Sequence, residues 1–78
     1  MAALEIIQQK GWIQRRPASL DGVCISRALW LAYGTHEGYR RARAKVASVI
    51  KTPNLVAWND KPGRTREEVL AVLQEARV

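Results

Sequence analysis

Hydrophobic positions recur at helical spacing along much of the chain, and each such stretch has its own start and stop signals. A first helix is expected over residues 2–10, where Gly11 follows as a C-terminal stop. A second is expected over residues 23–33, with Asp21 as the N-cap and Gly34 as the stop. The second segment is apolar over most of its surface, which is typical of a central, buried helix.

Two further helices follow in the second half of the chain. Thr35 is a suitable N-cap for a helix over residues 36–50. Thr65 is a suitable cap for a last helix over residues 66–77, and Glu68 stands three residues later. This spacing is that of a capping box, in which the glutamate reaches back to the amide of the capping residue.

The segment between these two helices predicts less regular structure. Residues 54–58 contain a short apolar run that fits either a strand or a buried connector. As a strand, its centre at Val56 would pair with the extended segment around Ile13 in a two-stranded ribbon. The pattern therefore predicts a mainly α fold, one small domain over residues 1–78 with about four helices, to which a short two-stranded β ribbon can be added.

A dense block of turn and cap signals begins at Trp58 and leads into the last helix. Pro62 and Gly63 suit the two central positions of a type II turn. Two interpretations of Trp58 and its neighbours are open. Either Trp58 anchors the core while Asn59 or Asp60 forms an Asx turn, or the loop is a surface recognition element. The first is favoured because so small a chain needs its tryptophans inside.

Composition narrows the classes of function. The chain has 78 residues, a net charge of +6 and a pI near 10.3, which favours acidic partners such as nucleic acid or an acidic protein. Its single cysteine excludes an internal disulfide and a multi-thiolate metal site. We therefore expect no metal and no cofactor. With neither a signal peptide nor a membrane-spanning apolar stretch in the sequence, a cytoplasmic protein without membrane contact is expected.

The strongest candidate for function is a cluster of cations in the third predicted helix, joined by a pair in the loop before the second. Such side chains can engage phosphates or carboxylates, and the alternative is a helix face that simply points to water. The cluster consists of Arg40, Arg41, Arg43 and Lys45, and the pair is Arg15 and Arg16.

Catalysis finds little support in the sequence. Cys24 in the first turn of a helix and His36, the only histidine, could be imagined as nucleophile and base. No orienting acid and no oxyanion element accompanies them. A free cysteine on an apolar helical face usually acts as a small core residue. We therefore predict no catalytic residue.

Three blocks of the sequence resemble a known family. They are Gly11-Trp12, then Asp21-Gly22-x-Cys24 with Ala28-Leu29, and finally Trp58-Asn59-Asp60-x-Pro62-Gly63-Arg64-Thr65-x-Glu67-Glu68-Val69-Leu70. Together they are similar to small proteins of unknown function that occur in actinobacteria and their phages. The resemblance implies an actinobacterial or actinophage setting and assigns no catalytic residue. It also implies that so small a product binds and modulates a host component.

The sequence thus predicts a non-enzymatic binding protein that acts on a host protein through its basic residues. The alternative is a DNA- or RNA-binding protein that uses the cluster between Arg40 and Lys45. Salt dependence separates the two, because binding to nucleic acid weakens log-linearly as salt rises.

Overall fold

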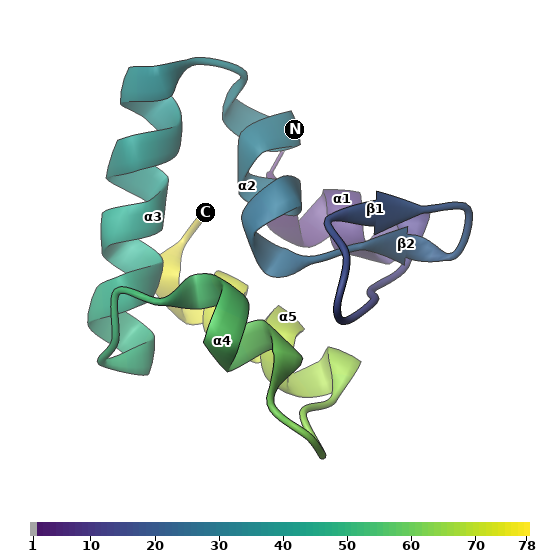
Figure 1. The fold of residues 1–78 in the computed structure, drawn as a ribbon. Helices are drawn as coiled ribbons and strands as arrows, with labels where there is room; N and C mark the ends of the chain where they lie inside the picture. Colours follow the sequence, from purple (N-terminus) through teal and green to yellow (C-terminus); the bar gives the residue numbers. More distant parts are fainter. Residues whose placement is uncertain (1) are drawn as a thin grey trace.

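The structure, a computed structural model that describes residues 2–78, has five helices and one β hairpin within that range (Figure 1). This is the mainly α single domain that the sequence predicts. In chain order the elements are α1 (Ala3–Lys10), β1 (Ala18–Ser19), β2 (Gly22–Val23), α2 (Ile25–Tyr33), α3 (His36–Ile50), α4 (Leu55–Asp60) and α5 (Arg66–Ala76).

One hydrophobic core joins all five helices. The apolar positions of α1 pack against α2, and α3 packs against both α2 and α5. Figure 1 shows α3 standing beside α2, with α4 crossing below them and α5 behind. The largest fully buried apolar side chains come from every helix and are Ile7, Ile25, Leu29, Val46, Leu55, Val69 and Leu73. None of the helices in residues 2–78 has the length and apolarity needed to span a bilayer.

The predicted helix ends at three glycine and threonine signals are confirmed. Gly11 donates its backbone N–H to the carbonyl of Ile7 and ends α1. Gly34 ends α2 in the left-handed conformation, with φ at 66°. The Thr35 hydroxyl accepts the backbone N–H of Gly38 and caps α3. These signals act within one helical turn, so neighbouring residues suffice to place them.

The predicted start of α2 is wrong. Asp21 lies in the turn of the hairpin, and the N-cap is Cys24, whose Sγ accepts the Arg27 N–H at 3.4 Å. The physical reason is that Val23 is extended and bonded to the segment after α1: its N–H donates to the Gly11 carbonyl, and its carbonyl accepts the Ile13 N–H. Residues 22–23 therefore belong to a ladder and not to a helix.

The segment after α3 is also a helix and not a strand. The Asn54 side chain accepts the Ala57 N–H at 3.0 Å and caps α4, which buries Leu55 and Asn59 one turn apart. Val56 faces outward, with 55% of its surface exposed. The ribbon of the structure is accordingly a different one, formed by β1 and β2 in the antiparallel register Ala18–Val23 and Ser19–Gly22.

The turn between α4 and α5 has the predicted type II geometry. The Arg64 N–H donates to the Lys61 carbonyl at 3.0 Å, and Gly63 has φ at 87°. A positive φ at this position favours glycine, since a side chain there would be strained. The turn places Thr65 at the start of α5, where the predicted capping box forms with Glu68.

Candidate functional site

The four predicted cations of α3 do not form a single free surface. Arg43 and Lys45 are two residues apart, so their side chains leave the helix about 160° from each other. Arg43 is half-buried and donates to the Pro53 carbonyl at 2.8 Å. Arg41 is paired with Glu37 at 2.6 Å, in an exposed i,i+4 salt bridge. Arg40 and Lys45 are exposed and enter neither of these contacts.

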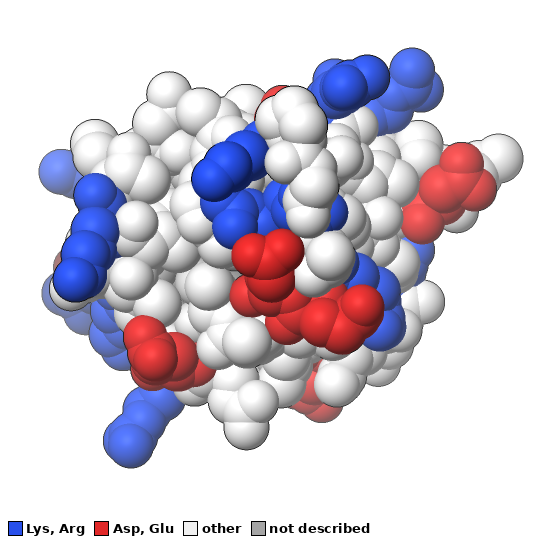
Figure 2. All heavy atoms as spheres, turned by 90° about the horizontal axis from the view of Figure 1, so that it is seen from below, with Lys and Arg blue, Asp and Glu red and all other residues white. Residues whose placement is uncertain are grey.

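Acidic side chains offset the basic balance on another face. The view in Figure 2 is from below the orientation of Figure 1, toward the end of the molecule that carries α4 and the turn before α5. Asp and Glu gather in the middle of this face, and Lys and Arg stand around its edge. The positive charge of the chain is therefore distributed in separate groups.

The most developed hollow of the described surface is a groove of about 550 Å³. It lies among the loop before β1, the first half of α2, Tyr39 of α3, and α4. Its lining residues are Arg15, Arg16, Pro17, Cys24, Ser26, Arg27, Trp30, Tyr39, Val56 and Asp60. This set is called the groove below. It contains the predicted pair Arg15 and Arg16, and it leaves out the four predicted cations of α3.

Three arginines give the groove its charge. Arg15, Arg16 and Arg27 are exposed, and within residues 2–78 none of them forms a salt bridge. Asp60 also lines the groove, but one of its oxygens already accepts the Arg15 N–H at 2.8 Å and the Asn59 amide at 3.0 Å. The side chains of the groove therefore carry three positive charges and one negative charge, and the positive ones are free to meet a partner.

The opposite wall of the groove is aromatic and braced from behind. The Trp30 ring meets the Tyr39 ring edge-on at 5.7 Å, and it meets the His36 ring edge-on at the same distance. The Tyr39 and Ser26 hydroxyls share a hydrogen bond of 2.7 Å. Edge-on contacts and a satisfied hydroxyl hold these rings in one arrangement. Val56 of α4 adds an exposed aliphatic surface.

A buried asparagine fixes the loop that carries the groove arginines. Asn59 has no exposed surface. Its Oδ1 accepts the Trp12 indole N–H at 2.6 Å and the Ile25 backbone N–H at 2.9 Å. Its Nδ2 donates to the Ile13 carbonyl at 3.1 Å. Because a buried polar group is costly unless it is bonded, this complete set of partners ties α4 to the loop and to the start of α2.

Gln14 extends the same connection. Its Nε2 donates to the Asn59 carbonyl at 3.0 Å and to the Lys61 carbonyl at 2.9 Å. Arg15 follows with φ at 71°, a left-handed conformation that is uncommon for a residue with a side chain. The bond from its N–H to Asp60 holds that conformation. Trp58-Asn59-Asp60 therefore supports the core and positions Arg15 and Arg16 at the groove.

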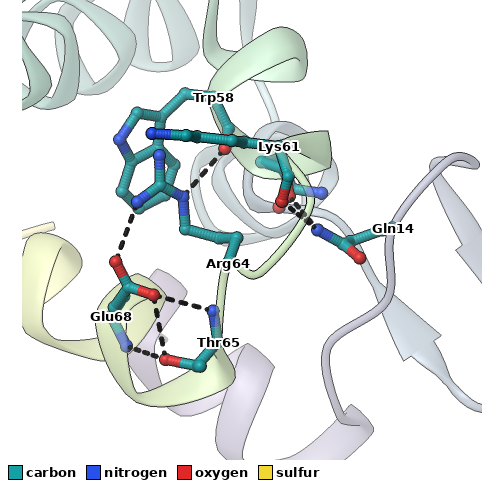
Figure 3. Close-up of polar contacts among 7 residues, drawn as sticks. Gln14, Trp58, Lys61, Arg64, Thr65 and Glu68 are labelled. Carbon is teal, nitrogen blue, oxygen red and sulfur yellow. Dashed lines mark hydrogen bonds and ion pairs between the residues drawn. The ribbon is translucent and has the colours of Figure 1, made fainter.

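Trp58 and the residues of the following turn form a second, structural cluster (Figure 3). The Arg64 guanidinium lies 3.9 Å from the centre of the Trp58 ring, and its Nε donates to the Trp58 carbonyl at 3.0 Å. Its other end forms a salt bridge with Glu68 at 2.8 Å. Hydrogen bonding to Arg64, together with the Thr65 backbone N–H, lowers the pKa of Glu68 below its ordinary value. The cluster closes the turn onto α5.

Acidification is expected to remove the contribution of Glu68 to stability, and Glu68→Gln is expected to remove that part of the pH dependence. The pKa is lowered in the folded chain from the ordinary 4.5, so the contribution is fully present above pH 4.5. It is lost as the pH falls through the lowered, folded value. Urea unfolding at a series of pH values checks this. Glu67→Gln is the matched control, and equal acid dependence in both variants would contradict the assignment.

Cys24 and His36 have structural surroundings. Cys24 is buried and serves as the N-cap of α2, and His36 is exposed at the start of α3 with its ring against Trp30. Among the residues that the structure describes, no three His, Cys, Asp or Glu side chains come together as a metal-ligand set. Arg27, Trp30 and Val56 were not predicted as part of a site, and the one signal for Arg27 was its place as the only charge in an apolar helix.

Comparisons with known proteins add a family and no activity. Searches of curated proteins and of solved structures found no match. Residues 1–78 match a family of unknown function, DUF6197, over their whole length. This chain therefore belongs to the family of unknown function DUF6197.

Proposed function

We propose that this protein is a non-enzymatic binding protein whose groove receives an acidic segment of a partner protein. The observation that carries the proposal is the grouping of Arg15, Arg16 and Arg27, free of salt bridges within residues 2–78, around one groove. Arginine suits this role because its planar guanidinium can donate two parallel hydrogen bonds to a carboxylate. The exposed Arg40 and Lys45 of α3 would steer the partner at longer range.

The arrangement of the loop supports binding. Asn59, Gln14 and Asp60 already hold the backbone that carries Arg15, so little order has to be gained when a partner arrives. A site that is held in place before binding loses less conformational entropy on association. As part of the proposal, the partner is a host protein in an actinobacterial cell, the setting that the sequence motif suggests.

Affinity capture from an actinobacterial lysate, with and without nuclease, tests the proposal. We expect a protein to be retained after nuclease treatment and to be lost with Arg16→Gln/Arg27→Gln. The matched control is Arg66→Gln/Arg77→Gln, which removes the same net charge at exposed positions outside the groove. The control is expected to retain the partner.

Direct binding to DNA or RNA is the competing outcome. In that case nuclease would abolish retention, and affinity for nucleic acid would fall log-linearly with salt. Loss of α3 cations, as in Arg40→Gln/Lys45→Gln, would then weaken binding more than loss of the groove arginines. Either result would overturn the proposed protein partner.

A further inference from the structure

We infer that the partner's acidic segment inserts one aromatic side chain into the groove, with its carboxylates on Arg15, Arg16 and Arg27. This inference rests on the proposed function and specifies the chemistry of the partner. It commits to an acidic peptide segment with an aromatic anchor.

The size of the groove requires more than an ion pair. Its volume of about 550 Å³ lies within the range of about 300–1,000 Å³ that is usual for sites that enclose a ligand. A carboxylate on an arginine would occupy only the rim of such a space. The remaining volume needs an occupant, and the walls decide its chemistry.

Those walls are apolar over a continuous stretch. Pro17, Trp30, Tyr39 and Val56 line the groove, and Val56 leaves 55% of its surface exposed there. An inserted aromatic ring would bury this surface and could meet Trp30 or Tyr39 in the offset or edge-on geometry that rings prefer. Arginines around an aromatic centre also match the composition of interface hot spots.

The same features argue against a nucleic-acid backbone as the occupant. A strand of phosphates needs a row of free cations along its path. Here Arg41 is paired with Glu37, Arg43 is bonded to the Pro53 carbonyl, and Asp60 stands at the border of the groove. A short segment with a few carboxylates and one ring fits the free arginines and the apolar wall together.

Three labelled polymers test the inference by fluorescence anisotropy with the full chain. They are a random copolymer of glutamate and tyrosine, a copolymer of glutamate and alanine of equal length and charge, and single-stranded oligo(dT). We expect the tyrosine copolymer to bind about tenfold more tightly than the alanine copolymer, the size of effect that burial of an aromatic ring can supply. The Trp30 indole N–H should shift in NMR spectra only with the tyrosine copolymer.

Two variants locate the effect. Val56→Ser, at a side chain that is more than half exposed, is expected to abolish the preference for the tyrosine copolymer. Leu20→Ser is the matched control, since Leu20 is fully exposed at the hairpin tip and lies outside the groove. Arg27→Gln, at another exposed position, is expected to weaken both acidic copolymers and gives a second test if Val56→Ser fails to fold.

The outcomes separate the inference from the proposed function. Equal affinity for the two acidic copolymers, with both dependent on Arg27, would overturn the aromatic anchor and leave the proposed function standing. Binding of neither acidic copolymer, with or without binding of oligo(dT), would overturn the proposed function and the inference together.

Discussion

Asn59→Ala is expected to lower the free energy of unfolding by about 3–5 kcal/mol, because it leaves several buried polar groups without partners. The groups concerned are the indole N–H of Trp12, the backbone N–H of Ile25 and the carbonyl of Ile13. A domain of 78 residues has a total stability of only about 4–12 kcal/mol, so the variant would be close to unfolding.

Urea unfolding monitored by circular dichroism measures the effect. Asn54→Ala is the matched control because it removes the same side chain from an exposed cap of α4, where the loss is about 1 kcal/mol. Equal losses in the two variants would show that the Asn59 contacts contribute little. A folded but weakened Asn59→Ala should also lose binding at the groove, since Asn59 and Asp60 position the loop that carries Arg15.

Gly22→Ala is expected to destabilise the chain by about 2–5 kcal/mol, through crowding added to backbone strain. A Cβ at this position would lie 2.4 Å from the carbonyl carbon of Gly11 and 2.7 Å from the nitrogen of Trp12. Both are backbone atoms, so relief requires the hairpin to move away from the end of α1. The φ of Gly22, at +150°, adds to the strain.

Gly34→Ala separates the two causes. Gly34 also has a positive φ, at 66°, but a Cβ there would meet no atom within 4 Å. Only the strain remains, which costs about 1–2 kcal/mol. Thermal or urea unfolding of both variants checks the difference. If Gly34→Ala were as damaging as Gly22→Ala, close contact between Gly11 and Gly22 would not explain the effect.

The contact of Gly11 with Gly22 also explains two blocks of the sequence motif. Gly11-Trp12 and Asp21-Gly22 stand about ten residues apart in the chain and meet backbone to backbone in the fold. Trp12 then points its indole to Asn59, in the third block. All three blocks therefore describe one structural junction. The groove arginines lie beside this junction, in the segment between the first two blocks.

The sequence indicated part of the candidate site. Arg15 and Arg16 stood out by charge, but the sequence pattern gave the leading role to the cations of α3. Nothing in the sequence linked the pair to Arg27, which the structure brings to the same groove. The sequence pattern could not show which cations were already occupied, because Arg43 is held by a carbonyl ten residues away, and any carbonyl can accept such a bond.

The sequence by itself determined where four of the helices lie and how most of them end. Caps and terminal glycines act over three or four residues, so Thr35, Thr65 and Gly34 carry their meaning wherever the chain folds. Only the tertiary structure decided the hairpin, the α4 helix and the groove. The bonds of Asn59 to Trp12 and Ile25 span 47 and 34 residues, and no local pattern records which distant partners will satisfy a buried amide.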